Sequence, residues 1–593
     1  MSLKFDPDDS LLNSSWATVL LSERDVAGQI PINFVTTTAI SLRAACFGDN
    51  KFDRTAAEKC LSNLIAVGYR RFDIDVYWSP SLWRWLLCPV SIPQDVQVVT
   101  TSLGPTPTAT ADLPEGTVAA EPDASSDDLL YELGPYQCSD GLALPDLLGV
   151  FRDYVQDTNS DLLMNTRFLS LNLHVAATSA DEPASTITEK QLPTESDRVS
   201  YIVEDKLGSY IYGPSNLLED RRNLNTSWYA VDDGYKPIVQ YYTIEQSPEG
   251  LQSTPDGWPS ANYVQLATER RLLVEYGSID TQLDGYDFSA ENDVIFPPGY
   301  LTSTVPVSAA DDGSLDSGCF YNPDETDISN VNASWAISNH IPIPRNLTDD
   351  QSLHYISDLV VNLTGCGITS TLNQTLFGNN TADNSPDPYR NLTLSSSWAW
   401  ALGQPEADTD DSEHKRCAIM DLSLNGQWRT ANCTQERLAA CRVGNHPFRW
   451  SVSSTPKSYK DAYNDADTCP PDTAFSIPRT GLENTYLYRY LLSESTNTID
   501  PTSSDPLKNE IWVDFNSRDI ATCWVTGGPD TTCPYTSDPD QLEKRTVLVA
   551  AIAGIVICII AALTLFVKCN ANRRNSRRNR RVIQEWEYEG VPS

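Results

Sequence analysis

The stretch TAAEKCLSNLIAVGYRRFDIDVY, residues 55–77, decides the fold of the first half of the chain. Apolar side chains recur at helical spacing in its first part, which predicts a helix over residues 55–67. Gly68 follows directly, where the end of a helix favours a residue that adopts positive φ. Residues 70–77 then alternate apolar and polar side chains, as a half-buried strand does. A helix that runs straight into a strand is typical of an α/β fold.

Two further segments repeat this pattern. FLSLNLHV, residues 168–175, alternates like a strand, and YVQLATERRLLVEYG, residues 263–277, predicts a short helix followed by a strand. Strand and helix patterns that alternate on this scale predict a TIM-type α/β barrel over residues 1–300. Stretches rich in Pro, Thr, Ala and Asp near residues 105–128 and 178–197 are expected to be disordered insertions.

The composition and patterning of the chain change after residue 300. Residues 301–365 combine N-x-Ser/Thr sequons with few apolar runs, so we expect a glycosylated linker there. Residues 366–535 contain short segments, tryptophans and closely spaced cysteines. This composition predicts an α+β region stapled by disulfides.

A membrane span is the clearest single feature. Residues 546–567, TVLVAAIAGIVICIIAALTLFV, carry no charge over 22 positions. As a helix they would be about 33 Å long, which is enough to cross a hydrocarbon core of roughly 30 Å. Seven Lys and Arg side chains follow in the tail, residues 568–593, and such positive flanks stay in the cytosol. The sequence therefore predicts a single-pass type I protein with a lumenal or extracellular N-terminal domain.

Cysteines, sequons and charge agree with this orientation. Twelve of the fourteen cysteines precede the span, which fits a compartment where disulfides persist. The same part of the chain carries 35 basic and 77 acidic residues, a net charge of −42, so direct binding of nucleic acid is not expected. The basic tail is instead expected to contact the lipid bilayer. Nine sequons precede the span, at Asn13, Asn225, Asn332, Asn346, Asn362, Asn373, Asn379, Asn391 and Asn432.

Two segments carry a resemblance to a catalytic fold. QIPINFVTTTAIS, residues 29–41, and GYRRFDIDVY, residues 68–77, resemble the opening of the phosphatidylinositol-specific phospholipase C-like phosphodiesterases. The resemblance implies a barrel in which two histidines act as general base and general acid. Here Thr36, Thr37 and Thr38 occupy the first position, and threonine cannot take a proton near neutral pH.

His174 could match the second histidine of that family, or it could be a hydrogen-bonded interior residue. Asp73 and Asp75 share one face of their strand and could hold a divalent cation such as Ca²⁺, or could pair with the neighbouring Arg70 and Arg71. Because one histidine is missing, we expect a barrel that has lost its activity and needs no cofactor. The alternative is a phosphodiesterase that acts on a phospholipid or glycerophosphodiester.

Residues 398–442, WAWALGQPEADTDDSEHKRCAIMDLSLNGQWRTANCTQERLAACR, resemble the C-terminal half of a C-type lectin-like domain. The resemblance implies a disulfide between Cys417 and Cys433, and one between Cys441 and an upstream cysteine such as Cys366. A second, more diverged copy over residues 469–535 would contain a short disulfide formed by Cys523 and Cys533.

Sugar-binding members of that family hold calcium through a loop that here reads Gln404-Pro405-Glu406, together with an Asn-Asp pair after the tryptophan. Arg429 and Thr430 stand in place of this pair. Glu406 is therefore only a weak metal candidate, and a lectin-like glycan receptor is a further alternative.

The combination of these features, with the segments QIPINFVTTTAISLRAACFGD and GYRRFDIDVYWS, resembles the fungal maintenance of telomere capping protein 6 family. The resemblance implies a type I membrane glycoprotein with a role in telomere capping. Because the large domain would lie outside the cytosol, we expect this role to be indirect. The leading hypothesis is a non-catalytic ectodomain that binds a protein, lipid or glycan partner in the secretory pathway.

Overall fold

The computed structural model describes residues 3–11, 14–93, 97–100, 117–122, 129–179, 184, 187–310, 313–341, 348–376, 380–406, 415–494 and 499–535. The chain separates into two compact units, Met1–Cys533 and Pro534–Ser593. The predicted span, residues 546–567, and the basic tail lie outside the described residues. None of the helices in the described part has the length and apolar character needed to cross a bilayer.

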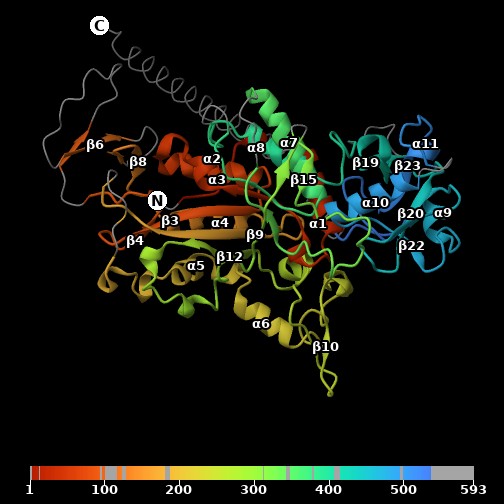
Figure 1. The fold of residues 1–593 in the computed structure, drawn as a ribbon, viewed down its shortest axis with the longest axis horizontal. Coiled ribbons are helices and arrows are strands. Elements are labelled where there is room, and N and C mark those ends of the chain that lie inside the picture. Colours follow the sequence, from red (N-terminus) through yellow and green to blue (C-terminus); the bar gives the residue numbers. More distant parts are fainter. Residues whose placement is uncertain are drawn as a thin grey trace, which may run out of the picture. The chain divides into compact units, whose positions relative to one another are not determined.

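A sheet of parallel strands forms the centre of the first unit, and Figure 1 shows three of its strands, β3, β9 and β12, side by side. The strand order is β12-β9-β3-β1-β17, and β4 pairs antiparallel with β3. The first four parallel strands pair in chain order, and β17 returns to pair with β1, as expected for part of a TIM barrel. The strands are β1 (Thr38–Ser41), β3 (Arg71–Ser79), β4 (Arg84–Leu86), β9 (Arg167–Val175), β12 (Leu272–Ile279) and β17 (Ser370–Leu372).

The helix and strand expected in residues 55–77 are both present. Helix α3 (Arg54–Ala66) begins after Asp53, whose Oδ1 accepts hydrogen bonds from the backbone N–H groups of Thr55 and Ala56. It ends before Gly68, which has a φ of 107°. The helices of the barrel region are α1 (Ser14–Val26), α2 (Leu42–Cys46), α3, α4 (Leu144–Asp157), α5 (Val199–Leu207), α6 (Pro214–Arg222), α7 (Asp349–Gly365) and α8 (Asp387–Ser395).

The alternation along the strands separates two environments. Phe72 lies against Phe151 of α4 with ring centroids 5.2 Å apart, so the apolar face of β3 packs on the helices. The apolar face of β9 belongs to the same core, where Leu171 and Leu173 have no exposed surface. The polar residues of both strands therefore face the opposite side of the sheet, toward the interior of the partial barrel.

The described parts of the two expected disordered insertions are ordered. Part of the first range forms β6 (Thr117–Pro122), within a sheet of order β2-β8-β7-β6-β5. In the second range, Trp78 and Trp85 donate their indole N–H groups to the backbone oxygens of Gln191 (2.7 Å) and Asp197 (2.9 Å). The prediction of disorder missed these buried tryptophan donors, which fix a polar segment in place. The other strands of the sheet are β2 (Lys51–Phe52), β5 (Gln97–Thr100), β7 (Leu129–Leu133) and β8 (Tyr136–Ser139).

Residues 301–365 do not form a linker, so that prediction is wrong. Helix α7 buries Leu359 and Leu363 completely in the barrel core, because its apolar residues recur at helical spacing. Strand β16 pairs with β13, and Thr369, next to β17, bridges to Ile337 of β16. The short strands of the region around it are β10 (Glu245–Gln246), β11 (Gln252–Ser253), β13 (Ser303–Val305), β14 (Ser308–Ala309), β15 (Leu315–Ser317) and β16 (Ala336–Ser338).

The C-terminal module is built on one sheet, in the teal to blue part of the chain in Figure 1. Its strand order is β19-β18-β23-β20-β21, with β22 paired to β20. Because β23 lies between β18 and β20, residues 469–535 complete this sheet and do not form a separate second copy. The elements are β18 (Cys417–Asp421), β19 (Gln427–Ala431), β20 (Leu438–Val443), β21 (Trp450–Val452), β22 (Thr473–Phe475), β23 (Glu510–Asn516), α9 (Tyr459–Asn464), α10 (Gly481–Ser493) and α11 (Pro506–Asn509).

Every cysteine among the described residues is in a disulfide. The pairs Cys417–Cys433 and Cys523–Cys533 are those expected. The expected bond between Cys441 and Cys366 is wrong, because Cys366 ends α7 in the barrel region and bonds to Cys319. Cys441 on β20 bonds instead to Cys469, close to the paired strand β22. The remaining pairs are Cys46–Cys60 and Cys88–Cys138.

Candidate functional site

The two acidic residues expected to lie together do so, and an amide lies between them. On the adjacent strand β9, Asn172 donates through Nδ2 to Oδ1 of Asp73 (2.8 Å) and to Oδ1 of Asp75 (3.0 Å). The parallel register places Asp75 directly beside Asn172. A donor therefore occupies the position between the carboxylates that a bound cation would take.

The orientation of this amide is fixed by its other end. Oδ1 of Asn172 accepts hydrogen bonds from the backbone N–H (2.8 Å) and the hydroxyl (3.0 Å) of Ser278. Because a backbone N–H only donates, the oxygen must face Ser278 and the NH₂ group must face the acids. The approach also requires Gly277, since an added Cβ would lie 2.3 Å from Oδ1 of Asn172.

His174 lies near the C-terminal end of β9, beside this pair. Its Nδ1 is 3.1 Å from Oδ2 of Asp280, and its Nε2 is 3.6 Å from Oδ1 of Asp75. The imidazole stacks on the ring of Tyr77, with centroids 4.9 Å apart. The Tyr77 hydroxyl in turn accepts a hydrogen bond from Arg43 (3.1 Å). Each polar group of this cluster therefore has a partner within it.

The environment separates the pKa values of the two acids. Burial, reinforced by the charge of Asp75, raises the pKa of Asp73 to about 6. Burial also acts to raise the pKa of Asp75, but contacts with His174 and Asn172 outweigh it and hold this pKa below its usual value. Burial acts to lower the pKa of His174, yet Asp75 and Asp280 together raise it. Asp75 and the histidine thus favour their charged forms, whereas Asp73 titrates near neutrality.

The position expected for the first histidine needs a correction. Thr36 and Thr37 precede β1 and Thr38 begins it, so all three lie at the opposite end of the strands from His174. At the end that contains His174, β1 continues into Ser41, whose hydroxyl accepts from the backbone N–H of Ala44. No histidine occupies this position either, so the conclusion that the first catalytic histidine is missing stays unchanged.

Arg70 and Arg71, the alternative partners expected for the two acids, lie on opposite faces of the strand. Arg71, the first residue of β3, forms a buried ion pair with Glu275 of β12 (3.5 Å). Its charge lowers the pKa of Asp73 only slightly compared with the effect of burial. Arg70 precedes β3 and lies on the opposite face, where burial lowers its pKa to about 10 although the charge of Glu23 acts to raise it.

The residues do not fit a metal site. Among the residues that the structure describes, no group of three or more His, Cys, Asp or Glu side chains is placed to hold an ion. Glu406 pairs with Lys415 (2.9 Å), and the side-chain oxygen of Gln404 accepts from the backbone N–H of Thr430 (3.0 Å). Arg429, which stands where the resemblance would have a calcium ligand, pairs with Asp421 of β18 (2.7 Å) and with Glu510 of β23.

The barrel that carries this site matches a known family. Residues 11–398 match the model of the MTC6 partial TIM-barrel domain, which covers more than half of the chain. The chain belongs to the MTC6 family. No solved structure matches it.

Relatives in the MTC6 family align along most of their length. "Maintenance of telomere capping protein 6" of Candida albicans (strain WO-1) is 23% identical, over 98% of this chain and 95% of the relative. The protein of the same name from Debaryomyces hansenii is also 23% identical, over 97% of this chain and 94% of the relative. That of Saccharomyces cerevisiae (strain ATCC 204508 / S288c) is 27% identical, over 76% of each chain.

Several residues of the site went unrecognised in the sequence. Asn172 shares the polar face of its strand with His174, and that periodicity is the signal that could have singled it out. Ser278 and Asp280 lie at the end of β12, the strand that pairs with β9. Polar residues that follow a parallel strand are the usual sign of a site at that edge, although nothing in the sequence pairs them with His174.

Proposed function

We propose that this MTC6-family chain is a single-pass type I membrane glycoprotein whose barrel binds a partner and does not catalyse a reaction. The observation that carries the proposal is the amide of Asn172 between Asp73 and Asp75. A general base must have a free lone pair directed at its substrate, and a metal must have open ligands. In this barrel the carboxylates are directed at an internal donor, and the histidine is held between two acids.

The absence of a second histidine partner at the site supports the same proposal. His174 makes its ion pairs with Asp75 and Asp280 and stacks on Tyr77. Among the described residues, no other histidine contacts it. Two-histidine phosphodiester cleavage therefore lacks a partner here.

Sequence and structure both support the membrane orientation. Residues 546–567 are apolar and are followed by an arginine-rich tail. The disulfides among the described residues are typical of proteins in an oxidising compartment, which supports a lumenal or extracellular N-terminal side. Of the six sequon asparagines in the described residues, none is buried, which supports glycosylation on this side of the span: Asn225, Asn332, Asn362, Asn373, Asn391 and Asn432.

The name of the relatives implies a role in telomere capping. For this chain we propose an indirect role, because a lumenal barrel is separated from chromatin by a membrane. The strongly acidic composition before the span also repels DNA. The effect would pass through a protein, lipid or glycan partner in the secretory pathway.

A phosphodiesterase is the second candidate, favoured by one specific observation. The pKa values of Asp73 and Asp75 are moved apart, which is the pattern of acid and base pairs in enzymes. In this scheme protonated His174 would donate a proton to the leaving oxygen. Asp73, with a pKa of about 6, would accept the proton of the attacking hydroxyl.

Turnover assays separate the two functions. The full-length chain, purified in detergent, is incubated with phosphatidylinositol and with glycerophosphodiesters, each with calcium and with chelator. No hydrolysis is expected, and His174→Ala should behave like the unaltered chain. His354, exposed on α7, provides the matched control His354→Ala. Turnover that is lost in His174→Ala and kept in His354→Ala would establish the enzyme and overturn the proposal.

Fractionation of the native membrane tests the topology. The chain should resist carbonate extraction, lose mass with endoglycosidase and expose no free thiol before the span. A protein that is extracted by carbonate and unchanged by endoglycosidase would refute the membrane glycoprotein. Affinity capture of the intact chain from solubilised membranes would then identify its partner.

A further inference from the structure

One disulfide among the described residues is open to solvent. Cys319 is the one exposed cysteine in this part of the chain, and its partner Cys366 has 9% of its surface exposed. Cys433 and Cys469 are half-buried and are bonded to fully buried partners, and the cysteines of the other pairs are buried. A thiolate must reach a sulfur atom in order to attack a disulfide, so the bond at Cys319 is the one that a thiol in solution reaches first.

The segment from Cys319 to Asp327, which we call the strap, crosses between the barrel and the C-terminal module. Phe320 packs against two buried cores, that of the barrel and the one that contains residues of α10. Tyr321 lies against Tyr486 of α10, with ring centroids 4.9 Å apart. Because its side chains contribute to both cores, the strap helps to join the two parts of the chain.

Polar contacts hold the rest of the strap. The Tyr486 hydroxyl accepts a hydrogen bond from the backbone N–H of Asn322 (3.2 Å) and donates to the backbone oxygen of Glu325 (2.8 Å). At the far end of the strap, Asp327 pairs with Arg449 (2.7 Å), but both side chains are exposed, and exposed ion pairs contribute little to stability. The disulfide is the one covalent tether of the strap within this part of the structure, and it fixes the first residue.

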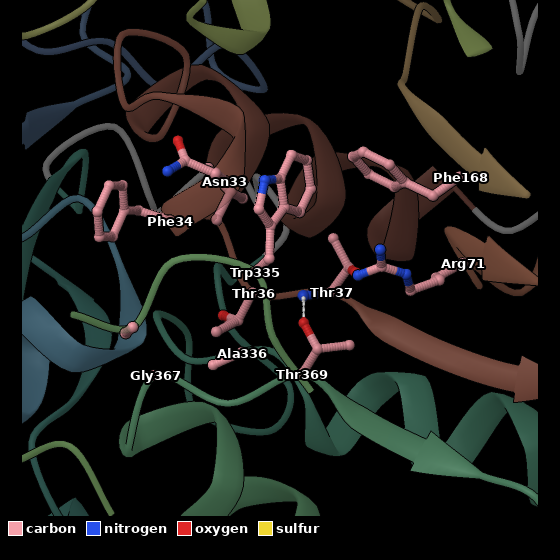
Figure 2. A pocket seen from close by; sticks show the side chains of 12 residues that line it. Asn33, Phe34, Thr36, Thr37, Arg71, Phe168, Trp335, Ala336, Gly367 and Thr369 are labelled. Atoms are coloured by element: carbon pink, nitrogen blue, oxygen red, sulfur yellow. Dashed lines mark hydrogen bonds between the residues drawn. The ribbon is translucent and has the colours of Figure 1, made fainter. Parts of the chain in front are cut away.

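Cys366, the other end of the bond, lies where α7 meets α10. An added Cβ at Gly481 of α10 would lie 2.6 Å from the backbone oxygen of Thr364, so the two helices pack at close range here. The chain then runs to Thr369, whose hydroxyl accepts a hydrogen bond from the backbone N–H of Thr37 (3.2 Å), as Figure 2 shows. The disulfide therefore connects the strap to the contact between the helices and to the segment that enters β17.

We propose that the Cys319–Cys366 disulfide is a thiol-exchange site, which a small thiol opens to release the strap. A thiolate attacks Sγ of Cys319, the bond to Sγ of Cys366 breaks, and Cys366 leaves as a thiolate that takes a proton from water. A second thiol group attacks the mixed disulfide, so two thiol groups of the reagent are oxidised to one disulfide while the protein gains two thiols. The site is separate from the polar cluster around His174, and it does not depend on the function proposed for that cluster.

Reduction of the folded, full-length chain by dithiothreitol tests the site. The thiols that form are alkylated at intervals and are assigned by mass spectrometry of peptides. Cys319 and Cys366 should be alkylated first, at a rate about 10-fold or more above that of Cys523 and Cys533. The second pair is the matched control, because these two cysteines are only 2% and 1% exposed. Equal rates for the two pairs, or reduction of Cys319–Cys366 only when the chain melts, would overturn the proposal.

Hydrogen exchange tests whether the strap is released. The chain in which only Cys319 and Cys366 are alkylated should exchange about 10-fold faster than the oxidised chain in residues 319–327, and at an unchanged rate in β3 and β9. Cys319→Ser combined with Cys366→Ser gives the same comparison without a reagent, and its melting temperature shows whether this variant folds. Unchanged exchange in the strap of the alkylated chain, or an equal increase throughout the chain, would contradict the release of the strap.

Discussion

Replacing Asp73 by Asn tests whether the buried charge of Asp73 destabilises the fold near neutral pH. The pKa of Asp73 rises from 3.8 to about 6, mainly because the carboxylate is buried. An acid whose pKa is higher in the folded state stabilises the fold at low pH, and this stabilisation is lost as the pH rises through the folded value. The window therefore runs from about pH 4 to about pH 7.

A shift of roughly two units corresponds to about 3 kcal/mol at neutral pH, by the conversion of 1.36 kcal/mol per unit. Asp73→Asn removes this cost but keeps an oxygen that accepts from Asn172. The variant should therefore be about 1–3 kcal/mol more stable than the unaltered chain at pH 7.5, and should show little difference at pH 4. Stabilisation by loss of a buried charge is common where a site is kept for function.

Thermal unfolding of the full-length chain at pH 4 and at pH 7.5 provides the measurement. A rise of a few degrees in the melting temperature is expected at pH 7.5 only. Asp387→Asn is the control, because the Asp387 side chain is 71% exposed and its substitution should change little at either pH. If Asp73→Asn lowers stability at pH 7.5, or changes stability equally at both pH values, the inference that the buried charge of Asp73 destabilises the fold is refuted.

Three further changes test other parts of the structure. Gly277→Ala should destabilise the chain by about 1–3 kcal/mol in thermal unfolding, because the added Cβ would collide with Asn172. Gly234→Ala is the control in the same experiment, since its Cβ would meet nothing within 4 Å. Asp280→Asn should lower the pKa of His174, which NMR of the imidazole measures, and an unchanged pKa would contradict the contact. The substitution should also cost more stability at pH 5 than at pH 9, because a raised histidine pKa stabilises the fold only below that pKa. Calorimetric titration with calcium should give the same heat for the unaltered chain and for Glu406→Gln, because Glu406 is already paired with Lys415. A heat of binding that is present in the unaltered chain and lost in Glu406→Gln would instead support the lectin-like calcium site.

Local patterns were enough to predict several elements of the barrel. The periodicity of residues 55–77 predicts α3, the turn at Gly68 and the alternating faces of β3, because these depend on neighbours along the chain. The two short-range disulfides of the C-terminal module were implied by the resemblance to C-type lectin-like domains. Reasoning from local patterns places Asp73 and Asp75 on one face. It failed for α7 and for the Cys319–Cys366 disulfide, which depend on packing between distant segments.

By itself, the sequence determined α3, β3, β9 and β12, which faces of β3 and β9 are polar, and that the chain carries one long apolar stretch before a basic tail. The tertiary structure alone decided that Asn172 lies between the two acids, that Asp280 reaches His174, and that Thr369 reaches Thr37. The physical reason is the separation along the sequence of the residues that interact. Periodicity reflects interactions between residues a few positions apart, whereas each of these contacts joins residues brought together only when parallel strands pair and the barrel curves.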